Sequence, residues 1–223
     1  MKIKANIHDA VHNPSSPRSS LVISKSDIEG AGNGLFSNEF IREGSPICEY
    51  KGDLCSMEDI RVLADEGKDS YILLLEEPHL VGLNGQVFIG INADPDHAQE
   101  VGYGGFANDR YTDYPKTILD LEKELKKAKA KLTAEHKDYI ESLDWNKRIP
   151  KEDSRKIKKW IKPISRISRK LYEEYVSHGY NAVYERLKGL PSFLLIALKD
   201  IYPGDEIFVP YGPIYWTPKD KKK

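Results

Sequence analysis

The chain has 223 residues, of which 39% are apolar, 10% aromatic and 31% charged. This length suits one domain with a large insertion, and the apolar content suffices for a hydrophobic core. The sequence lacks a run of about 18 apolar residues, which excludes a membrane-spanning helix, and its first ten residues lack the apolar stretch of a secretion signal. Two cysteines, Cys48 and Cys55, are too few for a disulfide framework. We therefore expect an intracellular protein, nuclear or cytoplasmic.

The net charge of −1 conceals two regions of opposite sign. Residues 113–178 contain 18 Lys and Arg against 12 Asp and Glu, whereas the remainder contains 16 against 23. The sequence thus predicts an acidic body that carries a basic insertion, and this asymmetry indicates a binding partner.

The first half of the chain predicts short strands and one helix. Residues 1–19, rich in Ser, Pro, Asn and His, are expected to form a flexible arm. Short apolar runs bounded by Gly, Pro, Asn or Asp predict strands at 21–23, 47–50, 71–75 and 87–91. Residues 56–66 predict a helix, because Ser56 suits the N-cap position and acidic residues follow it. Strands do not alternate regularly with helices, so we expect an α+β fold, mainly β, of small sheets with short strands.

From residue 117 to residue 176 the apolar residues follow a helical spacing. Residues 118–143 predict one amphipathic helix of about seven turns. The pattern resumes after Pro150 and continues to Tyr175, and Pro163 must start or kink a helix there because it lacks an N–H group. The expected object is a helical hairpin inserted between two parts of a sheet domain.

The last third predicts a β-hairpin. An apolar strand at 193–198 runs into a Pro-Gly-Asp turn, and a second strand then ends in Tyr211-Gly212. Two further segments attract attention, GAGNG at 30–34 and FAND at 106–109. Taken singly, the first fits a plain Gly-rich turn, the second fits an ordinary turn, and Trp216 fits a core aromatic.

Taken together, these segments resemble the SET-domain family of protein lysine methyltransferases. Residues 197–207 (ALKDIYPGDEI) are similar to the family's A-x-R-D-I-x-x-G-E-E-L, and residues 49–52 (EYKG) to its E-Y-x-G. Residues 105–109 resemble the start of R-F-x-N-H-S, with Gly105 in place of Arg and Asp109 in place of His. The resemblance implies a SET fold of several small sheets with a C-terminal pseudoknot, which Asn181 would support.

The resemblance also implies the site residues. The methyl donor would be S-adenosylmethionine, bound by Ala31, Gly32, Asn33, Gly34, Tyr71, Asn108, Asp109, Tyr211 and Trp216. Tyr211 and Tyr50 would be the catalytic residues, and with Val209 they would form the channel for the substrate lysine. The family places an aromatic residue at the position of Val209, and a small residue there favours addition of several methyl groups. No metal is expected. The SET domain would comprise residues 20–112 and 179–216, the basic hairpin residues 113–178, and a Lys-rich tail residues 217–223.

Two functions from different classes remain open. The first is a protein lysine methyltransferase, with histone tails as one candidate substrate. The second is an inactive or weakly active SET-like module for binding proteins or peptides, whose helical insertion binds a partner or nucleic acid. Residues 155–162 are the densest basic patch and could contact nucleic acid or a nucleosome, although a charged helix face is also commonly just solvated. The oligomeric state is not predicted.

Overall fold

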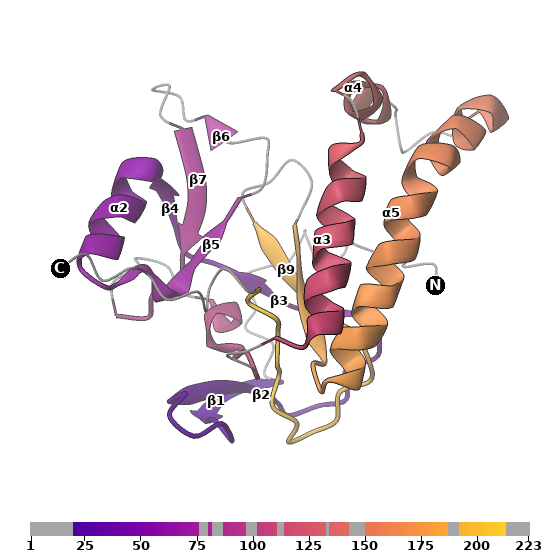
Figure 1. Ribbon diagram of the computed structural model, residues 1–223. Coiled ribbons are helices and arrows are strands. Elements are labelled where there is room, and N and C mark those ends of the chain that lie inside the picture. The colour runs from indigo at the N-terminus through magenta and orange to yellow at the C-terminus, as the bar shows by residue number, and fades with distance from the viewer. Residues whose placement is uncertain are drawn as a thin grey trace. The chain divides into compact units, whose positions relative to one another are not determined.

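A computed structural model describes residues 20–75, 80–81, 87–96, 102–110, 114–132, 134–142, 150–186 and 192–212. The chain divides into two compact units, which Figure 1 shows as ribbons. The first unit contains residues 1–110 and 179–223, and the second contains residues 111–178. The expected N-terminal arm, Trp216 and the Lys-rich tail lie outside the described residues.

The described part of the first unit contains three small antiparallel sheets. One sheet pairs β1 (Leu21–Lys25) with β2 (Asn33–Ser37). In the second, β9 (Phe193–Ala197) lies between β3 (Pro46–Tyr50) and β8 (Ala182–Arg186). In the third, β7 (Val87–Asn92) pairs with β4 (Asp53–Ser56), β5 (Ile72–Leu74) and β6 (Leu80–Val81). The predicted strands in the first half are confirmed, and the α+β architecture of short strands is as expected.

The core of this unit forms around β9, whose five residues are all buried. Leu195 at its centre is fully buried and packs with side chains from β2, β3 and the C-terminal segment, among them Leu35, Ile47, Ile201 and Ile207. A strand buried on both faces reads as a continuous apolar run, as FLLIA does, rather than as an alternating pattern. The core therefore joins residues near both ends of the chain.

Helix α2 (Met57–Asp65) begins as the sequence predicts. Ser56 accepts a hydrogen bond from the Asp59 N–H, and the Asp59 carboxylate accepts one from the Ser56 N–H, which completes a capping box. The Ser56 hydroxyl also donates to the Asp59 carboxylate at 2.7 Å, and this bond, together with the one from the Ser56 N–H, lowers the pKa of Asp59.

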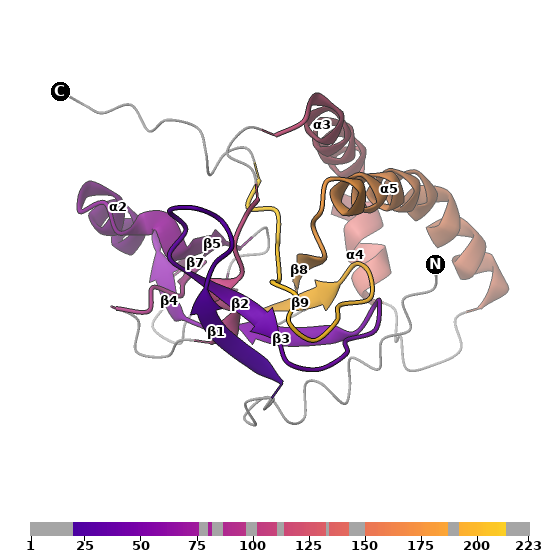
Figure 2. The same ribbon diagram turned by 90° about the horizontal axis from the view of Figure 1, so that it is seen from below.

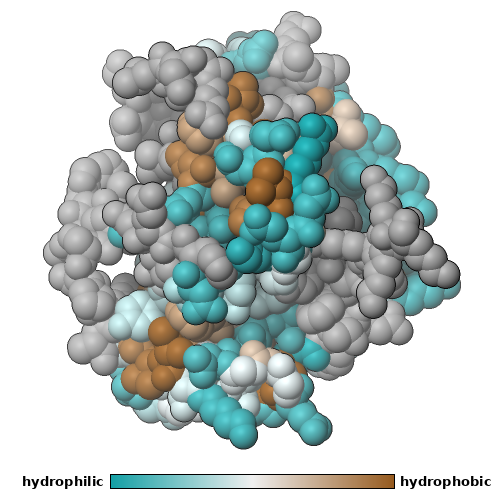
Figure 3. All heavy atoms as spheres, turned by 90° about the vertical axis from the view of Figure 1, so that its left-hand side faces the viewer, coloured by the Kyte–Doolittle hydropathy of each residue, from teal (hydrophilic) through white to brown (hydrophobic). Residues whose placement is uncertain are grey.

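Figure 3 shows the face of the molecule that lies on the left in Figure 1, where apolar side chains form several separate patches between hydrophilic ones.

The predicted C-terminal hairpin is wrong. β9 pairs with β3 and β8 and does not pair with the segment that follows the Pro203-Gly204 turn. That segment instead donates from the Ile207 N–H to the Leu35 carbonyl at 2.7 Å and from the Val209 N–H to the Asn108 carbonyl at 2.9 Å. A strongly apolar strand needs neighbours on both edges, and its local sequence does not say which distant segments supply them.

The second unit is helical within its described residues, with α3 (Lys116–Ala130), α4 (Ala134–Ser142) and α5 (Lys151–Ser177). α3 and α5 pack side by side, as in Figure 1, and the Tyr175 hydroxyl donates to the Glu122 carboxylate at 2.7 Å. Within the described residues, no helix combines the length and the apolar character needed to cross a membrane.

The expected seven-turn helix is interrupted, because α3 ends at Ala130 and α4 begins at Ala134. The apolar spacing continues across this break since Tyr139 of α4 still packs against Trp160 of α5, with ring centroids 5.6 Å apart. Pro163 lies inside α5 and does not start a helix. It cannot donate to the carbonyl of Lys159, and Figure 2 shows that α5 bends along its length.

One buried carboxylate, that of Glu206, joins three distant segments of the first unit. Glu206 is 4% exposed and accepts hydrogen bonds from the Ser26 hydroxyl at 2.7 Å and the Asp27 N–H at 2.9 Å. The Asn108 side-chain amide donates to it at 3.1 Å. A Cβ atom at Gly34 would collide with this carboxylate, so residue 34 must be glycine for the segments to meet.

The Asn181 side chain fastens the same C-terminal segment from the other side. Its amide donates to the Glu206 carbonyl at 2.8 Å and its oxygen accepts from the Phe208 N–H at 2.8 Å. The segment thus runs between β2, Asn108 and Asn181, which is the pseudoknot-like crossing expected from the sequence.

We expect Glu206→Gln to lower the free energy of unfolding by about 2–4 kcal/mol, because an amide nitrogen cannot accept and a buried donor loses its partner. Urea denaturation followed by circular dichroism measures this. Glu39→Gln makes the same chemical change at an exposed position and should alter stability by less than about 0.5 kcal/mol. An unchanged unfolding midpoint in Glu206→Gln would contradict a structural role for this network.

Candidate functional site

The three segments singled out in the sequence meet in the first unit. The Asn108 side-chain amide donates to the Asn33 carbonyl at 3.0 Å, which connects the middle segment to the Gly-rich turn. Asn108 also forms a parallel bridge with Phe208 of the C-terminal segment. The structure therefore brings Asn33, Asn108 and the approach to Tyr211 side by side.

The Gly-rich turn between β1 and β2 exposes its backbone. Gly30 and Gly32 have φ angles of 82° and 74°, a left-handed conformation that favours glycine. A Cβ atom at either position would meet nothing within 4 Å, so the space beside the turn is open. The Ser26 N–H donates to the Gly32 carbonyl at 2.9 Å and closes the turn.

The Asp109 carboxylate positions Tyr211. Asp109 is 7% exposed, and it accepts hydrogen bonds from the Tyr180 hydroxyl and, at 2.9 Å, from the Tyr211 N–H. Tyr180 is itself fully buried, so this carboxylate is held from the interior. In the structure Asp109 thus has structural partners on both oxygens, and its contact with a methyl donor stays a prediction.

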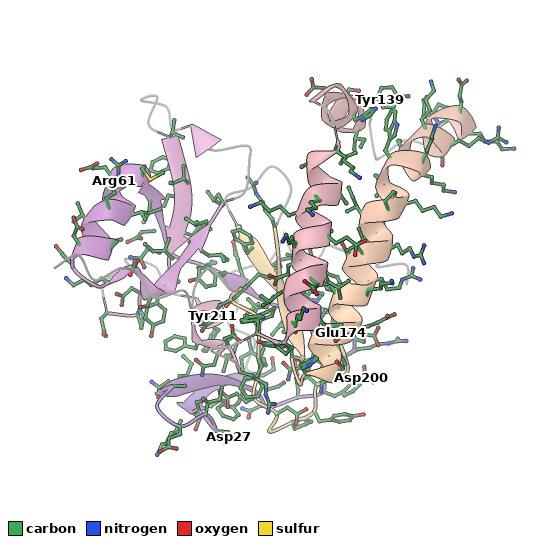
Figure 4. All side chains as sticks on the ribbon, viewed as in Figure 1. Asp27, Arg61, Tyr139, Glu174, Asp200 and Tyr211 are labelled. Carbon is green, nitrogen blue, oxygen red and sulfur yellow. The ribbon has the colours of Figure 1, made fainter. Side chains whose placement is uncertain are left out.

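A cavity of about 40 Å³ lies beside Tyr211 and has a largely aromatic wall. Its lining residues are Tyr50, Ser70, Tyr71, Ile72, Leu73, Gly105, Tyr184 and Tyr211. Tyr211 is labelled in Figure 4. Both tyrosines predicted to be catalytic, together with Tyr71, therefore face one cavity.

The tyrosine hydroxyls of this cavity donate to backbone carbonyls. Tyr211 donates to Ala107 at 2.9 Å and Tyr50 donates to Tyr71 at 2.6 Å. Tyr184 donates to Gly104 at 3.2 Å, and its ring meets that of Tyr50 edge-on with centroids 5.3 Å apart. Each hydroxyl proton is thereby used in a hydrogen bond to a backbone carbonyl, so each hydroxyl oxygen can act toward a ligand only as a hydrogen-bond acceptor.

Two of the tyrosines that line the cavity have raised pKa values. Desolvation raises the pKa of Tyr184 well above its ordinary value, and the nearby Tyr211 and Tyr50 add to the effect. Burial also raises the pKa of Tyr71, with further contributions from the negative charges of Asp94 and Asp96. The phenolate forms of Tyr184 and Tyr71 are therefore disfavoured.

Not every predicted site residue reaches this cavity. Val209 is fully buried in the hydrophobic core and is not among the lining residues, so its part in a substrate channel stays a prediction. Trp216 lies outside the described residues. Among the described residues, no group of three or more His, Cys, Asp or Glu side chains could hold a metal ion.

Sequence reasoning missed two residues of this region, Glu206 and Tyr184. Glu206 occupies a Glu position of the G-E-E-L motif, so the signal was present without an assigned role. Tyr184 lies in β8, beyond the helical insertion, and no motif marks it. Only its pairing beside β9 brings it next to Tyr50.

Comparison with known families agrees with this geometry. The family model described as SET domain matches residues 32–212, a range that contains residues 32–34 of the Gly-rich turn, Tyr50, Asn108 and Tyr211. This chain belongs to the SET-domain family. The segments that meet around Asn108 and the tyrosine cavity are therefore parts of a SET domain, and the helices of the second unit interrupt it.

Individual relatives are more distant. Histone-lysine N-methyltransferase EZH2 of Chaetomium thermophilum is 31% identical over 88 residues, which make up 36% of this chain and 6% of that protein. The chain therefore spans only a small part of this curated relative. Among solved structures, ATXR5 in complex with histone H3.1 mono-methylated on R26 is 13% identical with a TM-score of 0.42, covering 86% of this chain and 56% of that one. The methyltransferase domain of human PR domain-containing protein 2 is 11% identical with a TM-score of 0.41, covering 91% and 83%.

The raised pKa of Tyr184 predicts a loss of stability in alkali. Above pH about 10 the unfolded chain releases this proton while the folded SET domain retains it, so stability present below that pH falls as pH rises. In Tyr184→Phe, the decline between pH 9.5 and 11.5 should be shallower by up to about 1.4 kcal/mol per pH unit. Urea unfolding at several pH values measures these slopes. Tyr202→Phe, at an exposed site, should keep the wild-type slope; parallel curves for all three proteins would contradict the burial of this phenol.

Proposed function

We propose that this SET-domain protein transfers methyl groups from S-adenosylmethionine to a lysine side chain of another protein. The observation that carries the proposal is the cavity in which Tyr50, Tyr184 and Tyr211 all donate their protons to backbone carbonyls. Such oxygens can accept the N–H hydrogens of an amine and so orient its lone pair. A cavity of about 40 Å³ would admit only the tip of a slender, unbranched side chain.

Methyl transfer to an amine is an in-line displacement, in which placement contributes more than acid–base chemistry. A free lysine has a pKa of about 10.4, so the amine must lose its proton before it reacts. An aromatic and partly desolvated cavity disfavours the ammonium form and lowers the lysine pKa. Tyr211 and Tyr50 would then hold the neutral amine in register.

The residues present fit the methyl donor. S-adenosylmethionine, when bound, would supply an electrophilic methyl group on a positively charged sulfur. The backbone of Ala31, Gly32, Asn33 and Gly34 would hold it, with open space beside Gly32 and with Asn108 adjacent through its 3.0 Å bond to Asn33. Tyr71 contributes an aromatic face to the cavity wall, and such faces tolerate a cationic group.

The substrate class follows from charge. Outside residues 113–178 the chain carries 23 Asp and Glu against 16 Lys and Arg, which favours a basic partner. Near the cavity, the negative charges of Asp94 and Asp96 act on Tyr71. A basic peptide would be attracted to such a surface, and a histone tail is the substrate we propose to test first.

We expect Tyr211→Phe to reduce methyl transfer on the order of 100-fold or more, because the variant loses the hydroxyl oxygen that aligns the amine. Tritiated methyl transfer to mixed histones measures the rate, and mass spectrometry locates the modified lysines and counts the methyl groups. Tyr202→Phe, which removes a hydroxyl from an exposed tyrosine, should retain wild-type transfer.

Isothermal titration with S-adenosylmethionine separates the two functions left open by the sequence. Tyr211→Phe should still bind the donor within a few-fold of wild type, since the change keeps the ring and removes only the hydroxyl that donates to the Ala107 carbonyl. A wild-type protein that binds the donor but methylates nothing in histones or in a cell lysate would overturn the enzyme proposal and favour a SET-like binding module.

A further inference from the structure

Helix α5 carries a continuous basic face. At 100° per residue, eight of its nine cationic residues project within about 120° of one another, and all eight are exposed. We define this basic face as Lys151, Arg155, Lys158, Lys159, Lys162, Arg166, Arg169 and Lys170. Three of them, Lys162, Arg166 and Lys170, also line a cavity with Glu124 of α3. The buried residues of α5, among them Ile157 and Leu171, lie on the opposite side of the helix.

The charge on this face is not neutralised within the described residues. Lys156, which lies beside the basic face, pairs with Glu152 at 3.5 Å, whereas no ion pair to a described residue involves Lys159, Lys162 or Arg166. α5 contains nine Lys and Arg against four Asp and Glu, and two of these carboxylates, Glu152 and Glu173, fall in the sector of the basic face, near its two ends. Solvated helix faces usually mix both signs in i,i+4 pairs. This face does not.

We propose that the basic face of α5 binds the phosphate backbone of double-stranded nucleic acid. From Lys151 to Lys170 the helix rises about 28 Å at 1.5 Å per residue. Along the duplex axis each strand carries one phosphate per 3.4 Å, so this length corresponds to about eight base pairs. The basic face would meet the phosphates of both strands that point toward it, and eight cations suffice for that number.

The composition of the face distinguishes this ligand from others. Protein interfaces are centred on apolar and aromatic anchors and are depleted in lysine, and the basic face contains neither kind of anchor. Single-stranded nucleic acid is held by aromatic stacking as well as charge, and Trp160 of the same helix is instead packed against His136 and Tyr139. Backbone contact to a duplex requires only ordered cations.

The test measures binding of the full chain to a fluorescent 24-base-pair duplex by anisotropy at several salt concentrations. The slope of log K against log salt should lie between about −4 and −7, since each neutralised phosphate contributes about −0.9. A triple variant, Lys159→Gln, Lys162→Gln and Arg166→Gln, should bind on the order of 100-fold more weakly at 0.1 M salt. Its slope should be less negative by about 3.

The matched control removes the same charge from α3, through Lys116→Gln, Lys123→Gln and Lys126→Gln, and should change affinity by less than about threefold. Circular dichroism checks that both variants stay folded. Equal weakening in the two triple variants, or a slope near zero, would overturn the proposal. Tighter binding of polyglutamate of equal charge would indicate an acidic protein partner instead, and tighter binding of single-stranded DNA would exclude the duplex. None of these readouts depends on methyl transfer.

Discussion

The organisation of the SET domain depends on satisfying one buried carboxylate. Glu206 has little access to water, so its oxygens need protein donors, and they come from Ser26, Asp27 and Asn108. Meeting that requirement places the β1–β2 turn, the middle segment and the C-terminal segment together. The close approach leaves no room for a side chain at residue 34. A burial penalty at one residue thereby dictates the relative positions of three segments that are distant in the chain.

The same crossing sets the geometry of the cavity. Once the C-terminal segment lies against Asn108, the Asp109 carboxylate accepts from the Tyr211 N–H and the Tyr211 hydroxyl reaches the Ala107 carbonyl. Tyr50 and Tyr184 are tied to backbone carbonyls in the same manner. The rings are therefore held by main-chain groups rather than by other reactive side chains. Such an arrangement preserves neutral acceptors for an amine and fits a reaction in which positioning contributes most.

The two units differ in charge, and that difference suggests a division of tasks. The first unit carries the cavity on an acidic body, which suits a basic peptide. The second presents a row of cations on α5, which suits a phosphate polymer. A protein that recognises both would be directed toward basic protein segments that lie close to nucleic acid. The two activities can be measured separately, because the residues proposed for each belong to different units.

Local sequence determined the elements that depend on local interactions. The Ser56 cap, the short strands, the helical insertion and the family motifs with Tyr50, Asn108 and Tyr211 were all predictable, because periodicity, capping and motif spacing act over a few residues. The tertiary structure alone decided which strands pair, since the partners of β9 and of the C-terminal segment are chosen by burial of distant side chains. It also assigned Asp109 to support Tyr211 and brought Tyr184 to the cavity from beyond the insertion. The break between α3 and α4 could not be predicted from the sequence for a related reason. The apolar spacing continues across the break, because both helices contact α5. The spacing of apolar residues in a sequence predicts that a side chain is buried, whereas only the fold determines which side chains it packs against.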